Sequence, residues 1–269
     1  MKISVCGKGG SGKSAVTILL ANAFRKKGYR VLVMDSDESN FSLHRGLGFD
    51  TAPVPLLDLA GGKQQVKNLF PRSSRDPSGQ TTGVLGREKL RIADIPGDYI
   101  LSRDGVHLVS VGKILHSLEG CACPMGLLGR EFLNKLELET DEVVIVDTEA
   151  GLEHFGRGVE TGVDAVLVIV DPAYESLRLA ARIAEMVRQM EVPEVYAVLN
   201  KVPSADIAGE LSGELSRSNL RVIGTILYEP AIFEAGLYGR TLELGVDGQE
   251  ADQIVEALLA GFSNAGTKS

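Results

Sequence analysis

The sequence predicts an α/β protein with one doubly wound, mostly parallel sheet of about seven strands and helices on both faces. Short apolar and β-branched runs alternate along the chain with longer segments of helical periodicity. The runs are apolar throughout, which is typical of parallel strands buried on both faces. A length of 269 residues with 44% hydrophobic content suits a single domain over 1–269.

The strands are expected in chain order, each followed by a helical or irregular connection. Helical spacing of apolar residues is clearest over 175–190 and returns more briefly over 249–260. Residues 61–100, rich in Gly, Pro, Ser and charge, are expected to form an irregular insertion with one short helix. The expected strands are 2–6, 30–34, 106–111, 142–146, 165–170, 194–199 and 221–227.

Composition and charge exclude several classes of function. The net charge is −8 and no long basic run occurs, which argues against non-specific nucleic-acid binding. No segment is apolar for long enough to cross a membrane, and the polar end 264–269 lacks a basic amphipathic pattern. A strand starting at residue 2 leaves no room for a secretory signal. We therefore expect a cytoplasmic protein with no membrane or nucleic-acid partner.

A glycine-rich loop between the first expected strand and the first helical segment predicts a phosphate-binding loop. Its glycines allow backbone N–H groups to turn toward a phosphate, and the helix N-terminus favours an anion. Lys13 would reach the β- and γ-phosphate oxygens, and Ser14 would ligate Mg²⁺. The loop residues are Gly7, Lys8, Gly9, Gly10, Ser11, Gly12, Lys13 and Ser14.

Carboxylates end two further strands. Asp35 and Asp37 follow the second strand, and Asp147 ends the apolar run 143–146. Because ligands bind at the carboxyl ends of strands in open α/β sheets, these acids should lie close to the phosphate loop. Asp147 has the pattern of a residue that holds Mg²⁺ through water. The plainer alternative for Asp35 or Asp37 is a turn or helix-capping aspartate.

Two more segments are expected to interact with the nucleotide. Residues 148–158 follow Asp147 and would form a nucleotide-sensing switch, in which Gly151 supplies flexibility and His154 is either a contact or an ordinary packing residue. Asn200 and Lys201 end the sixth strand, and Pro203 stands where guanine-specific sites commonly carry an aspartate. The sequence therefore favours adenine, with Asn200 either a base contact or a turn residue.

Three cysteines without a secretory signal indicate thiols or thiolate ligands rather than structural disulfides. Cys121 and Cys123 stand one residue apart in the loop 120–126, whereas Cys6 is expected to pack at a strand end. A tetrahedral Zn²⁺ or Ni²⁺ site needs four ligands, so a twofold dimer would have to supply the other pair of thiolates. The alternative is a pair of half-buried cysteines preceding a helix.

The second lysine of the loop, Lys8, makes the loop similar to that of the deviant Walker A ATPases, a class of P-loop NTPases. The resemblance implies a homodimer in which Lys8 contacts the nucleotide of the partner subunit. It also implies that Asp37 orients the attacking water while Asp35 helps to organise the Mg²⁺ shell. The catalytic residues implied are Lys8, Lys13 and Asp37.

Over nearly its whole length the chain resembles the CooC-type accessory ATPases of carbon monoxide dehydrogenase maturation. The resemblance rests on the phosphate loop, the Cys-x-Cys loop 120–126, the segment 147–154 and the segment 170–176. It implies ATP-dependent dimerisation, Ni²⁺ or Zn²⁺ at the paired Cys121 and Cys123, and nickel delivery to carbon monoxide dehydrogenase or acetyl-CoA synthase.

Two alternatives stay open. A reductase similar to the nitrogenase iron protein would bridge its dimer with an iron–sulfur cluster, but its cysteines normally come from separate loops. A positioning ATPase of the ParA/MinD type would bind DNA or membrane, and the basic or amphipathic surfaces that this requires are not evident in the sequence.

Overall fold

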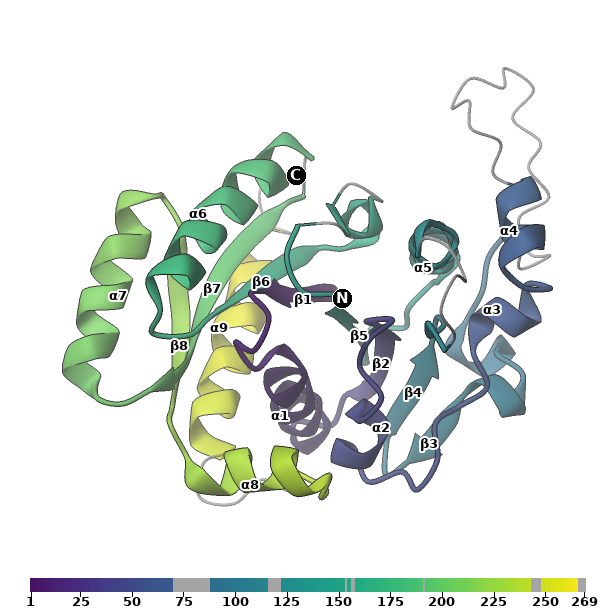
Figure 1. Ribbon diagram of the computed structural model, residues 1–269, viewed down its shortest axis with the longest axis horizontal. Coiled ribbons are helices and arrows are strands. Elements are labelled where there is room, and N and C mark those ends of the chain that lie inside the picture. The colour runs from purple at the N-terminus through teal and green to yellow at the C-terminus, as the bar shows by residue number, and fades with distance from the viewer. Residues whose placement is uncertain are drawn as a thin grey trace.

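The computed structural model describes residues 1–69, 88–115, 122–152, 154–155, 158–190, 192–242 and 248–265. These residues share one eight-stranded sheet with the order β3-β4-β2-β5-β1-β6-β7-β8 (Figure 1). Every neighbouring pair is parallel except β3 and β4. The strands are β1 (Lys2–Gly7), β2 (Arg30–Ser36), β3 (Leu101–Arg103), β4 (Val106–Ser110), β5 (Glu142–Thr148), β6 (Ala165–Val170), β7 (Glu194–Val202) and β8 (Arg221–Leu227).

The prediction of a mostly parallel sheet is confirmed, and all seven expected strands are present. The strand that the prediction lacks is β3, an edge strand of three residues that pairs antiparallel with β4. A run this short carries no periodicity, so the sequence gives no sign of it.

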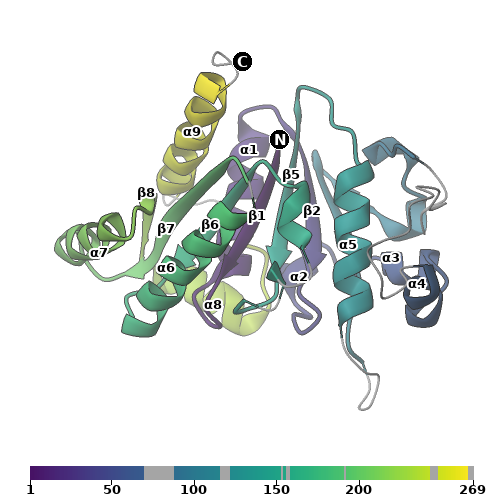
Figure 2. The same cartoon turned by 90° about the horizontal axis from the view of Figure 1, so that it is seen from above.

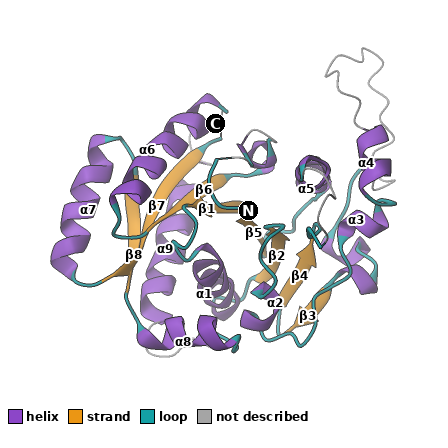
Figure 3. Cartoon of the chain, in the orientation of Figure 1, coloured by secondary structure: helices purple, strands orange, loops and turns teal. Residues whose placement is uncertain are grey.

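Helices cover both faces of the sheet. In Figure 1, α5 and α6 lie above the sheet and α1 and α9 lie below it, and the colouring in Figure 3 shows the same layers. Figure 2 looks down on the molecule from above, so that α5 and α6 face the viewer. The helices are α1 (Lys13–Lys26), α2 (Leu43–Gly46), α3 (Leu56–Leu59), α4 (Lys63–Leu69), α5 (Cys123–Lys135), α6 (Tyr174–Gln189), α7 (Ala205–Arg217), α8 (Pro230–Tyr238) and α9 (Gly248–Ala265).

The sheet separates two hydrophobic cores, which explains the continuous apolar runs. In β2, Leu32 and Met34 face the core beneath α5 and α6, whereas Val31 and Val33 face the core beneath α1 and α9. All four side chains are fully buried. Successive side chains of a strand point to opposite faces, so a strand covered on both sides must be apolar at every position.

The described parts of the insertion contain the short helix that was expected and two turns of 3₁₀ helix. Its first part forms the short helix α4, and 88–100 contains two 3₁₀ turns, Ile92–Asp94 and Gly97–Tyr99. Leu90 pairs with the chain after α5: its N–H donates to Lys135 O at 2.9 Å and its carbonyl accepts from Glu137 N at 2.8 Å. This segment therefore packs against α5. The stretch 73–85 lies outside the described residues.

Strand register places the candidate site along one edge of the sheet. Val5 of β1 pairs with Asp147 of β5, Asp147 with Asp35 of β2, and Asp35 with Ser110 of β4. Four neighbouring strands thus end at one level, and the residues that follow them come together there. Among the described residues, none of the helices has the length and apolar character needed to span a bilayer.

Candidate nucleotide-binding site

The glycine-rich loop between β1 and α1 adopts a conformation suited to glycine. Gly7 and Gly12 have φ of +144° and +93°, in the region that side chains rarely enter. A Cβ on Gly12 would lie 2.3 Å from Asn200 Nδ2, and a Cβ on Gly7 would lie 2.5 Å from Ile169 O. Because α1 begins at Lys13, the loop leads directly into a helix N-terminus.

Lys13 and Lys8 meet across this loop. The Lys13 side chain is buried, and its Nζ donates to Lys8 O over 3.5 Å, the outer limit of a hydrogen bond. The N–H of Ser11 donates to the same carbonyl at 3.2 Å. The ammonium of Lys13 is thus held at the loop by a weak contact, which a phosphate oxygen would replace at little cost.

Ser14 and Asp147, expected to hold Mg²⁺, are in direct contact. Ser14 Oγ donates to Asp147 Oδ2 at 2.6 Å. Asn40 Nδ2 donates to Ser14 Oγ at 2.8 Å, and Thr17 Oγ1 lies 3.5 Å from Asp147 Oδ1. Asn40 and Thr17 are not among the site residues expected from the sequence. Asn40 lies in the loop after β2, so the strand-end rule that identified Asp37 could also have found it.

Burial sets the protonation of the two strand-end carboxyls. Asp147 is fully buried, which raises its pKa to about 7; the hydrogen bond from Ser14 opposes the rise, and the charge of Asp35 adds to it. Burial also raises the pKa of Asp35 to about 6, although the ammonium of Lys113 lowers it. The carboxyl groups of Asp147 and Asp35 favour the binding of a cation between the strand ends, because a positive charge offsets the cost of burying two carboxylates.

Asp35 has a partner that the sequence analysis did not name. Lys113 Nζ lies 2.8 Å from Asp35 Oδ1 and 2.7 Å from Asp35 Oδ2, and it also donates to the main-chain oxygen of Asp37 at 2.5 Å. Asp37 Oδ1 accepts from the N–H and the Oγ of Ser39 at 2.9 and 2.6 Å. Lys113 follows β4, the neighbour of β2, so the strand-end rule could have pointed to it.

The strand-end pair Asn200 and Lys201 binds the phosphate loop. Asn200 Nδ2 donates to Ser11 O at 2.8 Å and Lys201 Nζ donates to Gly10 O at 2.7 Å. A Cβ on Gly9 would lie 3.7 Å from Ala150 Cβ, so the segment after β5 borders the same loop. Asn200, Lys201 and the segment after β5 therefore border the loop, while the contact of Asn200 with a base stays a prediction.

A family model described as the CobQ/CobB/MinD/ParA nucleotide binding domain matches residues 3–242, which include every site residue named above. The chain belongs to this family. Its fold matches that of the cell division ATPase MinD of Pyrococcus furiosus, with a TM-score of 0.68 at 20% identity over 96% of this chain and 98% of that one.

Several similar proteins match nearly the whole chain. An uncharacterized ATP-binding protein of Methanocaldococcus jannaschii is 44% identical over 96% of this chain and 99% of its own length. The carbon monoxide dehydrogenase accessory protein CooC of Rhodospirillum rubrum is 31% identical over 89% of this chain and 88% of its own length. The chain is therefore an ATP-binding family member of the CooC-like class.

Lys8, the second lysine of the family loop, pairs within its own chain. Its Nζ lies 3.8 Å from Asp171 Oδ2, and the side chain is 37% exposed. An ion pair of this length and exposure contributes about 0–1 kcal/mol. Lys8 therefore loses little stabilisation on turning away from Asp171, a residue that the sequence analysis did not identify.

The segment after Asp147 is anchored to the phosphate loop. Gly151, at φ +91°, donates its N–H to Gly7 O at 3.2 Å, and Thr148 Oγ1 donates to Val5 O at 2.9 Å. His154 is buried and lies against Phe155, with ring centroids 4.4 Å apart. This contact agrees with the packing alternative for His154. Residues 153, 156 and 157 lie outside the described part of the chain.

Of the Cys-x-Cys pair, only Cys123 lies among the described residues; Cys121 lies outside them. Cys123 is exposed and is the first residue of α5. Within the described residues, no three His, Cys, Asp or Glu side chains group as a metal site would require. Cys6 is fully buried in β1, as expected.

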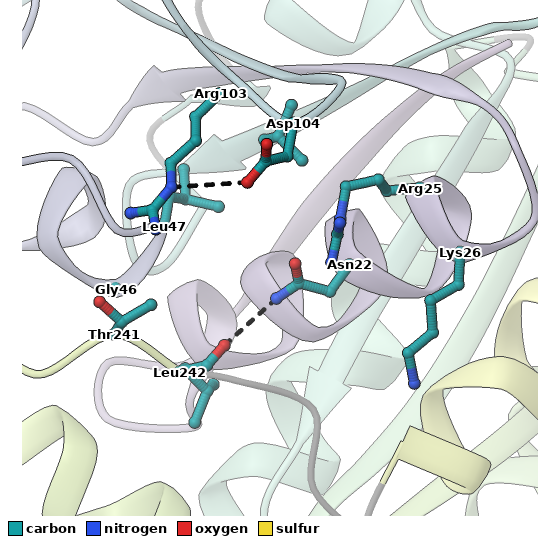
Figure 4. A pocket seen from close by; sticks show the side chains of 10 residues that line it. Asn22, Arg25, Lys26, Gly46, Leu47, Arg103, Asp104, Thr241 and Leu242 are labelled. Atoms are coloured by element: carbon teal, nitrogen blue, oxygen red, sulfur yellow. Dashed lines mark hydrogen bonds and ion pairs between the residues drawn. The ribbon is translucent and has the colours of Figure 1, made fainter.

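A pocket of about 250 Å³ lies away from the phosphate loop, toward the end of α1 (Figure 4). Asn22, Arg25 and Lys26 of α1 line one side, and Arg103 and Asp104 of the β3–β4 turn line the other. Arg103 pairs with Asp104 at 3.6 Å, and Asn22 Nδ2 donates to Leu242 O at 3.2 Å. None of the site residues predicted from the sequence lines it.

Proposed function

We propose that this protein is an ATP-hydrolysing maturation factor that couples nucleotide-dependent dimerisation to nickel delivery into carbon monoxide dehydrogenase or acetyl-CoA synthase. The observation that supports the ATPase most directly is the 2.6 Å contact between Ser14 and the fully buried Asp147 beside the phosphate loop. The delivery role rests on the relative named as a carbon monoxide dehydrogenase accessory protein and on the Cys-x-Cys loop.

The donor set at this edge fits Mg²⁺, which prefers oxygen ligands. Ser14 Oγ would bind the ion directly and Asp147 through water, with Asp35 in the surrounding shell, and the bound ion would neutralise charge on the β- and γ-phosphates. Lys13 and the N–H groups of the loop would bind the same oxygens. Asp37 would orient the attacking water, and Asn200 would contact the adenine.

Dimerisation would complete the site. Lys8 would leave Asp171 and reach the nucleotide of the partner subunit, which gives the ATP-bound dimer a contact that a monomer lacks. Because contacts to the γ-phosphate exist only before hydrolysis, ATP favours the dimer and hydrolysis releases it. The metal is the cargo in this scheme, and Ni²⁺ or Zn²⁺ would bind four thiolates, Cys121 and Cys123 from each chain.

Nickel-free carbon monoxide dehydrogenase provides the direct test. We expect Ni²⁺, ATP and this protein together to restore carbon monoxide oxidation faster than Ni²⁺ alone. The Lys13→Ala and Cys123→Ser variants should each lose the gain, because one lacks a phosphate ligand and the other a metal ligand. An activation rate equal to that with Ni²⁺ alone would remove delivery to carbon monoxide dehydrogenase, while ATP hydrolysis would still be measured separately.

The iron–sulfur alternative predicts a different product. A cluster held by cysteines would give protein purified without oxygen a brown colour and an absorbance band near roughly 400 nm. Colourless protein that binds Ni²⁺ or Zn²⁺ favours delivery.

A further inference from the structure

We propose that Lys113 is a positioning residue that links the phosphate site to the start of α5, where Cys123 lies. This inference rests on the proposed function, because it assumes that ATP and the cysteines belong to one cycle. It concerns a residue that touches none of the expected phosphate or metal ligands except Asp35.

The Lys113 side chain is bonded to the loop that follows β2. Its Nζ is within 2.8 Å of both carboxylate oxygens of Asp35 and bonds to the main-chain oxygen of Asp37. The side chains of Lys113 and Asp35 are only 11% and 9% exposed. A buried ion pair that also binds the backbone holds a loop far more firmly than an exposed pair, since either partner alone would be a buried charge.

The backbone on both sides of Lys113 is also bonded to this loop. The N–H of Val111 donates to Asp35 O at 2.9 Å, and the N–H of Ile114 donates to Glu38 O at 3.2 Å. The residues after β4 therefore run beside the loop 35–38 and are bonded to it on either side of Lys113. A displacement of Asp37 would move this segment as well.

The segment that carries Lys113 packs against the first turn of α5. A Cβ on Gly112 would lie 2.7 Å from Met125 Sδ, so the backbone next to Lys113 is in close contact with the first turn of α5. Cys123 begins that turn. Val111 Cγ2 would likewise lie 3.7 Å from a Cβ on Gly129, one turn further along the helix. Close packing transmits a shift of the segment to the helix start.

Binding of Mg²⁺ and nucleotide would change the electrostatic force on the Lys113–Asp35 ion pair. The acidic side chains of Asp35 and Asp37 lie close enough to Asp147 to act on its charge, and Lys113 is paired with Asp35. The arrival of Mg²⁺ with a nucleotide, or its loss, changes the positive charge beside the Lys113–Asp35 pair and so the force on the loop. The start of α5 would then respond to the nucleotide through Lys113.

The test compares Lys113→Met with Lys135→Met. Lys135 pairs with Glu131 on α5, with side-chain exposures of 17% and 9%, so its loss is a matched control for a partly buried ion pair. ATP affinity, ATP turnover and the rate at which iodoacetamide alkylates Cys123 are measured with and without Mg²⁺–ATP. A Cys121→Ser background, freed of metal, isolates the Cys123 signal.

We expect Lys113→Met to keep ATP affinity within about threefold while turnover falls about 10- to 100-fold, as for loss of a residue that orients a catalytic group. Its Cys123 alkylation should no longer respond to ATP. Lys135→Met should retain normal ATP turnover and the ATP response of Cys123 alkylation. If Lys113→Met and Lys135→Met behave alike, or if ATP leaves Cys123 alkylation unchanged in protein that hydrolyses ATP, Lys113 is not such a link.

A second variant separates misfolding from loss of the link. Lys113→Met with Asp35→Asn removes both charges and leaves no unpaired buried ion. It should fold, as its circular dichroism would show, and still lose the ATP response of Cys123; retention of that response would overturn the inference. Wild-type protein that does not hydrolyse ATP would overturn the proposed function instead.

Discussion

At the scale of single residues, the site is defined by carboxylates that the fold buries beside the phosphate loop. Asp147 lies at the end of a strand in the middle of the sheet, where it is fully buried, and its hydrogen bond from Ser14 offsets only part of the desolvation cost. Such a group is costly for stability without a cation. Placing it there is consistent with a site shaped for Mg²⁺ rather than for the stability of the empty protein.

Replacing Asp147 by Asn should stabilise the nucleotide-free protein at neutral to alkaline pH. The pKa of Asp147 rises from 3.8 in the unfolded chain to about 7 in the folded protein. Between these values the folded state retains a proton that the unfolded state has lost, so stability falls as pH rises through this window. The gain from Asp147→Asn should be on the order of 2–4 kcal/mol at about pH 8 and much smaller at about pH 4.

Urea unfolding at the two pH values measures this gain. Asp141→Asn is the control, because its guanidinium partner Arg30 lowers the pKa of that exposed carboxyl and reverses the direction of the effect. An Asp147→Asn protein less stable than wild type at the higher pH would show that the carboxylate is stabilised by its neighbours.

Asp37→Asn should trap an ATP-bound dimer. The amide oxygen can still accept from Ser39, so the loop keeps its shape, but the group no longer orients and activates water as a carboxylate does. Hydrolysis should fall by about 10²- to 10⁴-fold while ATP binding persists. Turnover assays with light scattering measure both. Hydrolysis at the normal rate would make Asp37 structural and Asp35 the candidate.

The sequence identifies these residues to different degrees. Ser14 and Asp147 follow from a loop motif and a strand end, and the structure places them in contact. Lys113 and Asn40 also follow strand ends, which makes them candidates, but a single lysine or asparagine after a strand is common at any surface. Their roles depend on which strands are neighbours, and the order β4-β2-β5 is known only from the fold.

At the scale of elements, polar residues explain where the predicted boundaries differ from the observed ones. The expected strands 30–34, 142–146 and 194–199 continue to Ser36, Thr148 and Val202. The added residues are mostly polar, so from the sequence they resemble loop residues. They remain in the sheet because their side chains bond within the site, as Asn200 does with Ser11.

Glycines also set the distance between helices and the sheet, which allows a test of packing. A Cβ on Gly224 of β8 would lie 2.2 Å from Ile254 Cγ1 of α9. Gly224→Ala should therefore force α9 away from β8 and cost about 1–3 kcal/mol of unfolding free energy. Gly213 in α7 faces open space, so Gly213→Ala should instead stabilise the protein by about 0.5–1 kcal/mol.

Chemical denaturation of both variants measures the difference between a crowded and an open glycine. Equal stabilities would mean that Ile254 adopts another rotamer at no cost and that α9 does not depend on this contact.

At the scale of the whole molecule, the proposed cycle requires two chains. Lys8→Ala should keep much of the ATP affinity but lose ATP-driven dimerisation and hydrolysis, because the side chain would act on the nucleotide of the partner subunit. Lys13→Ala should lose nucleotide-dependent function altogether. Light scattering with and without ATP distinguishes the two. A Lys8→Ala protein that dimerises and hydrolyses normally would confine Lys8 to its pair with Asp171.

The metal stoichiometry tests the dimer most sharply. Each chain offers two thiolates, Cys121 and Cys123, and a tetrahedral site takes four, so we expect one Zn²⁺ or Ni²⁺ per dimer. Changing either cysteine to serine should abolish tight binding, because it removes half of the ligands. Cys6→Ala is the control: Cys6 is fully buried in β1, so its loss should leave metal binding unchanged.

Metal binding should also strengthen the dimer, since a ligand that requires two chains favours their association by linkage. Metal analysis along a titration, combined with sedimentation, measures the ratio and the assembly together. One metal per monomer, or unchanged affinity in Cys121→Ser, would exclude a site shared between chains. The nucleotide site would stand, but the cysteines would then no longer connect ATP hydrolysis with metal delivery, and the protein would be better explained as an ATP-dependent switch.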